Sequence, residues 1–306
     1  MEILPQNHQW RKRVENTPND YSKFIGEWLV DIEKQDISKP ALGIINGWQA
    51  RYSENQWYAE ALKDYMSIYA YDSRGQGNSP KDGKLDAVQG AIDANAILTK
   101  SFDEYDRVSI DSGLSISNKS IQAHCAGGMS AAALFAGRFP IADRLSSLIL
   151  LSPVNTFNLP VFIKPIYFLP AKLVRFATRY IAPSVINKVQ ASEESRRNAM
   201  QRLSRIDINA GVRQSKAIFW KENVEKYWKY VKVPTLIFVS RKDPVTTIEE
   251  SKEVFDCLPF GIWWELKADD HFILESNIEL IKKILPEFTS DPWGFYDKYK
   301  SNSPEI

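Results

Sequence analysis

Cys125 lies in a segment that has the composition of a catalytic turn. The segment AHCAGG covers residues 123–128, and its small residues let the backbone bend sharply and let a following helix pack close to its strand. A cysteine in such a turn projects outward above a helix N-terminus, where free amides and the helix dipole favour a thiolate and stabilise an oxyanion. The segment therefore predicts a nucleophile between a strand ending at His124 and a helix beginning near Ala126.

A cysteine nucleophile needs a base that keeps its thiolate available and a third group that orients the base. The chain has three histidines, His8, His124 and His271, so imidazole chemistry has few possible positions. Only His271 lies downstream of Cys125, and it follows a strand-like run. Asp243 follows the preceding strand-like run, and we expect its carboxylate to orient His271. We expect His124 to pack against a neighbouring loop.

Each of these residues also has a structural alternative. A cysteine beside a helix start is often a small buried hydrophobe, which is our interpretation of Cys257. Asp243 precedes Pro244 and would also suit the cap of the next helix. Asp269 and Asp270 are alternative acids, although a residue next to a histidine in sequence seldom reaches its Nδ1. The joint placement of the three candidates favours catalysis.

The elements that would position these residues are alternating strand-like and helix-like segments. The strand-like runs are short, apolar and without clean alternation, as in a parallel sheet covered on both faces; they are residues 41–46, 67–72, 120–124, 147–152, 234–240 and 261–267. Helical patterns between them cover residues 54–63, 86–104, 126–139, 248–258 and 276–288. This alternation predicts an α/β fold with a mostly parallel, doubly wound sheet.

Four further stretches lie outside this alternation. Residues 23–32 are expected to form a first strand or hairpin, residues 105–119 have no assigned structure, and the polar tail after residue 289 is expected to be loosely packed. The interval 154–230 has no strand-like run and contains several prolines, which predicts a helical lid inserted into a core made of residues 1–153 and 231–306. Its aromatic and apolar residues would line a substrate slot or form lid core; they are Phe157, Phe162, Ile166, Tyr167 and Phe168.

The composition restricts the function classes. The chain has 306 residues, of which 44% are hydrophobic and 25% charged, and a formal net charge of +1, which gives no reason to expect a nucleic-acid partner. Two cysteines form no disulfide framework, and no signal peptide or membrane span is evident, so we expect a cytoplasmic protein. No P-loop or metal-ligand cluster occurs, and the sequence predicts no cofactor and no metal site.

Several motifs in order resemble those of the α/β-hydrolase superfamily. The segment AHCAGG resembles its nucleophile elbow, G-x-S-x-G, with cysteine for serine and Ala123 for the first glycine. The order of nucleophile, acid and histidine is also that of the superfamily. Residues 72–79, DSRGQGNS, resemble the D-x-R-G-x-G-x-S turn, whose role is to support the oxyanion loop.

This resemblance implies an oxyanion hole made of two backbone amides. One belongs to Ala126, directly after the nucleophile. The segment Asn46-Gly47-Trp48 resembles the superfamily's H-G-hydrophobic loop, so the second amide would be that of Trp48, and Asn46 stands where the family has histidine.

These residues predict an α/β-hydrolase-fold enzyme that cleaves an ester or thioester through a covalent thioester on Cys125. His271 would act as base and acid, Asp243 would orient it, and the substrate would be a small acyl compound with an apolar portion. Transfer of the acyl group to a second substrate is the first alternative, because a thioester also reacts with amines and thiols. A non-catalytic protein that binds a small ligand on the same fold is the second.

Overall fold

The computed structural model describes residues 20–29, 39–113, 118–157, 207–243, 245–268, 271 and 273–300, together with single positions between 169 and 205. Within these residues seven strands form one sheet in the order β1-β3-β2-β4-β5-β6-β7. The strands are β1 (Gly26–Trp28), β2 (Ala41–Ile45), β3 (Ser67–Tyr71), β4 (Lys119–His124), β5 (Ser147–Leu151), β6 (Thr235–Val239) and β7 (Gly261–Glu265). Only β1 is antiparallel to its neighbour; the other pairs are parallel.

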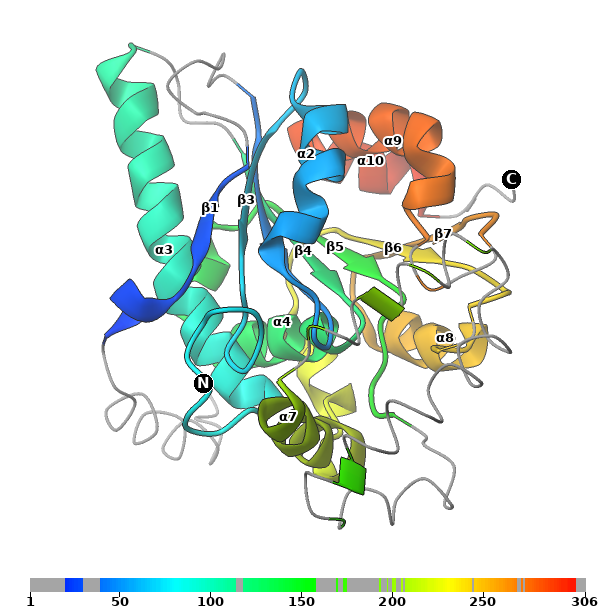
Figure 1. Cartoon of the computed structure of the whole chain (residues 1–306). Helices are drawn as coiled ribbons and strands as arrows, with labels where there is room; N and C mark the ends of the chain where they lie inside the picture. The colour runs from blue at the N-terminus through cyan, green and yellow to red at the C-terminus, as the bar shows by residue number, and fades with distance from the viewer. Residues whose placement is uncertain are drawn as a thin grey trace.

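The strands β2, β5 and β6 are fully buried because helices cover both faces of the sheet (Figure 1). The edge strand β7 differs from the expectation of burial on both faces, because its residues alternate between buried and half-buried. One face packs against α3 (Ala87–Asp111), α4 (Ala126–Ala136) and α8 (Ile248–Cys257), and the other against α2 (Gln56–Leu62), α9 (Ile278–Ser290) and α10 (Pro292–Tyr299). Two hydrophobic cores result, one on each face. This three-layer arrangement confirms the mostly parallel α/β sheet predicted from the alternation of elements, and it is the α/β-hydrolase fold that the resemblance implies.

The direction of strand addition reverses between β2 and β4, which are adjacent in the sheet. The chain passes from β2 outward to β3, returns through α3 to β4 on the other side of β2, and then adds β5, β6 and β7 in turn. Ligand sites of open α/β sheets lie at the carboxyl ends of strands where this order reverses. Cys125 follows β4 and Gly47 follows β2, so both lie at this point.

All six predicted strands and the five predicted helical segments are confirmed, and the region 23–32 contains the edge strand β1. Much of the unassigned stretch 105–119 is helical, because α3 continues to Asp111 with Tyr105 and Ser109 buried.

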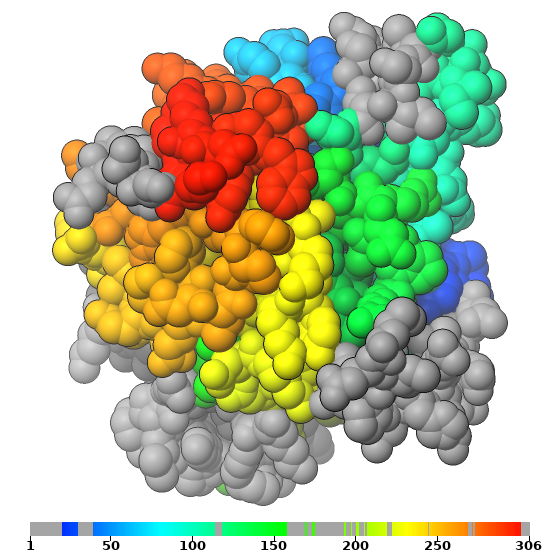
Figure 2. Space-filling view, turned by 180° about the vertical axis from the view of Figure 1, so that it is seen from behind, coloured from blue at the N-terminus to red at the C-terminus, as the bar shows by residue number. Residues whose placement is uncertain are grey.

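The prediction of a loosely packed tail is wrong for its described part, residues 290–300. Residues 292–299 form α10, where Phe295 and Tyr299 pack on each other at 4.5 Å between ring centroids, and Tyr299 packs on Trp264 of β7 at 5.4 Å. Figure 2 shows the red C-terminal helix lying directly against the orange segments that precede it. Aromatic residues spaced along one face of α10 attach it to the sheet, although its other face is polar.

Only part of the predicted lid interval 154–230 falls within the described residues. It includes α7 (Ile208–Lys221) and the short 3-10 helix η6 (Glu225–Tyr230), which follows it. The side chain of Trp228 in η6 is fully buried, and its Nε1 donates to Oδ1 of Asn155 at 2.7 Å. Phe157 is buried and belongs to the hydrophobic core on the α4 face of the sheet.

Candidate active site

Cys125 occupies a strained turn between β4 and α4. Its backbone has φ of 52° and ψ of −119°, a combination that costs a non-glycine residue energy and that concentrates at functional sites. The turn is held by the amide of Cys125, which donates to the carbonyl of Leu151 at 2.9 Å. The structure therefore places Cys125 in a sharp turn that joins the end of β4 directly to the start of α4.

The helix that begins at Ala126 lies very close to the end of β2. A Cβ atom at Gly127 would come within 2.5 Å of the Ile45 carbonyl oxygen and 2.7 Å of that of Asn46. Only glycine fits there, which brings the first turn of α4 against the loop that follows β2. As the first residue of α4, Ala126 has an amide with no carbonyl partner inside the helix.

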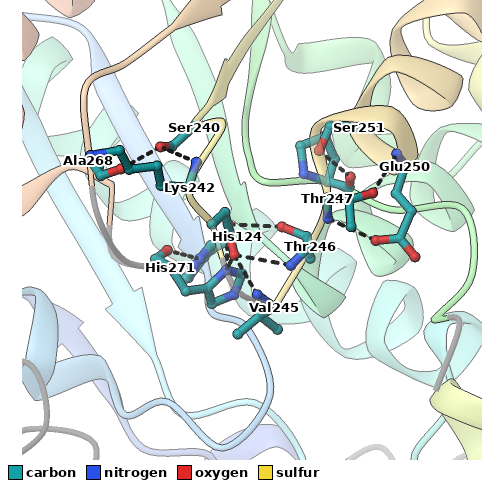
Figure 3. A network of polar contacts seen from close by, with 12 residues as sticks. His124, Ser240, Lys242, Val245, Thr246, Thr247, Glu250, Ser251, Ala268 and His271 are labelled. Carbon is teal, nitrogen blue, oxygen red and sulfur yellow. Dashed lines mark hydrogen bonds and ion pairs between the residues drawn. The ribbon is translucent and has the colours of Figure 1, made fainter. Parts of the chain in front are cut away.

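His271 and Asp243 are brought together from two loops at the carboxyl edge of the sheet. Nδ1 of His271 donates to Asp243, at 2.8 Å from Oδ2 and 3.0 Å from Oδ1. The same carboxylate accepts the amides of Val245 and Thr246, at 2.8 Å and 3.0 Å, and the Thr246 hydroxyl at 2.9 Å. Figure 3 shows Val245, Thr246 and His271 converging in this network. The Asp243 carboxylate is therefore held by the loop of Val245 and Thr246 and by the imidazole of His271.

Electrostatic interactions couple His271 to both Asp243 and Cys125. Burial disfavours a charged imidazole, but the negative charge of Asp243, followed by that of Cys125 and the hydrogen bonds with both, raises the pKa of His271 to about 10. Burial likewise disfavours a charged Asp243, yet the His271 charge and its hydrogen bonds hold the pKa of the carboxyl well below its usual range. His271 thus lies near both Asp243 and Cys125, and both side chains favour its charged form.

His124 packs against the loop of His271, as the sequence predicts. The two rings lie 4.6 Å apart between centroids, with an angle of 33° between their planes. Nε2 of His124 donates to the backbone carbonyl of His271 at 3.2 Å. A carbonyl only accepts, so this bond requires the proton on Nε2. His124 therefore holds the loop of His271 through ring packing and one hydrogen bond, and neither contact requires a charge on His124.

The loop after β2, predicted to supply the second oxyanion donor, lies against the elbow. A Cβ atom at Gly47 would be 3.1 Å from the His124 carbonyl oxygen and 3.4 Å from Cβ of Cys125. Asn46, which stands where the family has histidine, is hydrogen-bonded: its Oδ1 accepts from Asn55 at 3.0 Å and its Nδ2 donates to the Tyr71 carbonyl at 3.5 Å.

The turn at residues 72–79 braces this loop. Oδ1 of Asp72 accepts the amide of Tyr52 at 2.9 Å, and Oδ2 accepts the amide of Asn78 at 3.0 Å, so one carboxylate joins two loops. Arg74 forms two hydrogen bonds with the buried Asp93 of α3, at 2.7 Å and 2.9 Å. These contacts agree with the supporting role that the resemblance implies for the D-x-R-G-x-G-x-S turn.

Three residues at the site were missed in the sequence. Thr246 holds the carboxylate of Asp243, Gln76 donates to the Gly47 carbonyl at 2.8 Å, and Gln214 of α7 accepts from Gln49 of the oxyanion loop at 2.8 Å. Gln76 occupies a variable position of its motif, and Gln214 belongs to the lid interval, so neither type nor spacing singled them out. The predicted residues Phe162, Tyr167, Asp269 and Asp270 lie outside the described residues.

Two clefts flank the elbow within the described part of the chain. One, of about 550 Å³ including the part open to solvent, is lined by His124, His271 and the apolar side chains of Trp57, Leu151, Ile273 and Leu274. The other, of about 460 Å³ measured in the same way, is more polar and is lined by Gly47, Gln76, Ala126, Gly127, Ser130 and Gln214. Cys125 itself lines neither cleft, but its neighbour His124 lines the first and its neighbour Ala126 lines the second.

The described residues contain neither a metal-binding cluster nor a helix that could span a membrane. Among them, no group of three or more His, Cys, Asp or Glu side chains is arranged to hold a metal ion. No helix within the described ranges has the length and hydropathy needed to cross a bilayer.

The family model described as Serine aminopeptidase, S33, matches residues 43–261, from β2 to the start of β7. This match covers well over half of the chain, so the chain belongs to this family of α/β hydrolases. It is an enzyme of the hydrolase type. The family's description names a serine, whereas this chain has Cys125 at the elbow.

Solved structures show the same fold. A hydrolase from Oleispira antarctica superimposes with a TM-score of 0.67 at 18% identity and covers 89% of this chain and 97% of its own. An enol-lactonase from Burkholderia xenovorans gives a TM-score of 0.67 at 17% identity, with 87% and 95% covered. An esterase from Exiguobacterium antarcticum gives 0.64 at 15% identity, with 87% and 94% covered. No curated protein matches the chain.

Proposed function

We propose that this hydrolase cleaves a carboxylic ester or thioester through a Cys125–His271–Asp243 triad and a covalent thioester intermediate. The observation that carries the proposal is the position of His271, which is hydrogen-bonded to Asp243 at 2.8 Å and lies close enough to Cys125 for both side chains to raise its pKa. A complete set of nucleophile, base and orienting acid at a strained elbow favours catalysis over mere ligand binding.

The proposed reaction begins with the ion pair of the Cys125 thiolate and the His271 imidazolium. The thiolate attacks the substrate carbonyl carbon, a C–S bond forms, and the negative charge moves to the carbonyl oxygen, which accepts from the amides of Ala126 and Trp48. The carbon–oxygen or carbon–sulfur bond to the leaving group then breaks, and the leaving group takes the proton of His271. The products of this half-reaction are an alcohol or thiol and a thioester on Cys125.

In the second half-reaction neutral His271 removes a proton from water, whose oxygen attacks the thioester carbonyl. The resulting tetrahedral intermediate collapses, the acid leaves, and the ion pair of Cys125 and His271 is restored. Asp243 stays ionised throughout and keeps Nδ1 of His271 in its position as donor. An amine or thiol in place of water would give acyl transfer.

The cleft beside His271 supports a substrate with an apolar portion. It is lined by Trp57, Leu151, Ile273 and Leu274, and a concave apolar site with a few polar groups is typical of small-molecule binding. The enol-lactonase and esterase neighbours act on compounds with an ester bond, as their names state, which agrees with an ester or lactone substrate here.

The proposal is tested by comparing the wild type with Cys125→Ala and Cys257→Ala on p-nitrophenyl acetate, p-nitrophenyl butyrate and an acyl thioester. We expect Cys125→Ala to lower kcat by about 10³-fold or more, since no nucleophile remains. Cys257→Ala is the matched control: burial and the nearby Glu225, Asp256 and Glu253 raise the pKa of this thiol, so it is a poor nucleophile. Equal turnover by the wild type and Cys125→Ala would exclude the triad.

A second measurement separates hydrolysis from transfer. Turnover is repeated with hydroxylamine or a small thiol added, and the products are separated. If the acyl group passes quantitatively to the added nucleophile while release to water is slow, acyl transfer is the better description.

A further inference from the structure

We infer that Gln76 is a positioning residue for the oxyanion hole, acting through the peptide group that joins Gly47 to Trp48. The inference rests on the proposed function, because an oxyanion develops only if Cys125 attacks a carbonyl. Nothing in the motif that contains Gln76 assigns it this role, since it stands between Gly75 and Gly77 at a variable position.

The contact is short and enclosed. Nε2 of Gln76 donates to the carbonyl oxygen of Gly47 at 2.8 Å, and the Gln76 side chain is 1% exposed. Gln76 lies in the loop after β3 and Gly47 in the loop after β2, so the bond joins two neighbouring loops at the carboxyl edge of the sheet.

Because of peptide geometry, the hydrogen bond from Gln76 to the Gly47 carbonyl also sets the direction of the Trp48 N–H. The carbonyl of Gly47 and the amide of Trp48 belong to one planar unit, and in a trans peptide the N–H points opposite to the C=O. Cis peptide bonds are absent from the described residues. A donor on the oxygen side therefore fixes the plane and directs the Trp48 N–H away from Gln76. The bond also polarises the peptide group and makes that N–H a stronger donor.

The peptide group lies beside the nucleophile. A Cβ atom at Gly47 would be 3.4 Å from Cβ of Cys125, so there is no intervening side chain. The next residue but one, Gln49, has φ of 59°, and its side chain donates to Gln214 at 2.8 Å. The loop is thus held at both ends of a short turn, and Gln76 is the side chain that holds its carbonyl.

The side-chain oxygen of Gln76 indicates that this residue does more than stabilise the fold. Its Oε1 is buried and has no hydrogen-bond partner within the described part of the chain. A buried acceptor without a partner is destabilising, so an apolar side chain of similar length would suit this position better if only stability mattered. The presence of glutamine is explained by the donor that Nε2 supplies.

The experiment uses Gln76→Met, which keeps the length but removes the donor and the unpartnered acceptor. Pre-steady-state release of p-nitrophenol from p-nitrophenyl acetate reports acylation, in which an oxyanion forms. Alkylation of Cys125 by iodoacetamide reports the thiolate and His271 without any oxyanion. We expect the acylation rate constant to fall about 10- to 100-fold, the alkylation rate to stay within about twofold, and resistance to urea to be kept or increased.

Gln76→Glu provides an independent test in case Gln76→Met does not fold. The ionised carboxylate of this variant cannot donate to the Gly47 carbonyl, whereas the protonated acid can. Relative to the wild type at each pH, acylation by Gln76→Glu is expected to be slow at neutral pH and to recover as the pH falls.

Three results separate the possibilities. Acylation by both variants at the wild-type rate would overturn the inference and leave the proposed function standing. A parallel loss of acylation and alkylation would also overturn it, because it would show a general disturbance of the elbow. Absence of any acyl-enzyme in the wild type would overturn the proposed function itself, and this inference with it.

Discussion

Nδ1 of His271 lies 2.8 Å from Oδ2 of Asp243, although the two residues are 28 positions apart in the sequence and follow different strands. The loops after β6 and β7 end at the same edge of the sheet, since these strands are parallel and paired from Thr235 to Val239. The carboxylate is fixed by Thr246, so the direction of the imidazole is set by the fold before any substrate binds.

Removal of the charge on Asp243 is expected to lower catalysis severely. In Asp243→Asn the side chain keeps its shape, but the negative charge that holds His271 as an imidazolium is lost. We expect kcat for ester cleavage to fall by about 10²- to 10⁴-fold. Asp256→Asn is the control, because that exposed carboxylate pairs only with Lys252 among the described residues and should leave kcat unchanged. Wild-type kcat in Asp243→Asn would show that Asp243 is not the orienting acid.

The protonation state of His271 can be measured directly, because the chain has only three histidines. With a pKa of about 10, the His271 imidazole should stay protonated at pH 8, and its nitrogen chemical shifts should show this in a ¹⁵N-labelled sample. Cys125→Ala removes one of the two negative partners, so the titration should move to lower pH. A His271 that titrates near pH 6.5 in both proteins would contradict the ion pair.

The same charge affects the free energy of unfolding. The pKa of His271 is raised on folding, so its stabilising contribution is complete below about pH 6.5, the value of an unperturbed histidine, and is lost as pH rises through about 10. We expect urea midpoints of the wild type to fall across this range. In Cys125→Ala the fall should be smaller and should occur at lower pH. Identical pH profiles for the two proteins would exclude this contribution.

Two adjacent glycines of α4 should respond oppositely to alanine. At Gly127 a Cβ would overlap the carbonyl oxygens of Ile45 and Asn46, and backbone cannot move aside cheaply. We expect Gly127→Ala to cost about 1–3 kcal/mol and to slow acylation, since the elbow must separate from the oxyanion loop. At Gly128 the nearest atoms are 3.7 Å away, so Gly128→Ala should fold and gain up to about 1 kcal/mol from helix propensity. Equal effects would show that this close approach is not required.

Gly77 gives a test of the brace behind the oxyanion loop. Its φ is 46°, and a Cβ there would lie 1.8 Å from Oδ2 of Asp72, the carboxylate that joins Tyr52 and Asn78. Gly113 has φ of 70° but nothing within 4 Å, so alanine there meets backbone strain alone, about 1–2 kcal/mol. Gly77→Ala should therefore be clearly more destabilising in urea and should also lower kcat. Similar unfolding midpoints for the two variants would mean that Asp72 can move freely.

Most of the sheet is predictable from the sequence because its strands are buried on both faces and form unbroken apolar runs such as the SLILL of β5. The positions of Cys125, Asp243 and His271 at one edge of the sheet are predictable because each residue follows a predicted parallel strand. Gln76 is not, because its role arises from the distance between two loops, which strand periodicity does not report. The packing of the helix α10 is not, because it depends on contacts of its aromatic side chains with Trp264 and Phe288, which the sequence pattern does not report.

The most direct test of the account is the site of the covalent intermediate. The enzyme is mixed with p-nitrophenyl butyrate, quenched in acid within the burst phase, and examined by intact mass and by peptide mapping. The account predicts one butyryl group per chain, located on Cys125, absent from Cys125→Ala and unaffected by Cys257→Ala. Turnover of the ester with the acyl group on another residue, or with Cys125→Ala as active as the wild type, would contradict it.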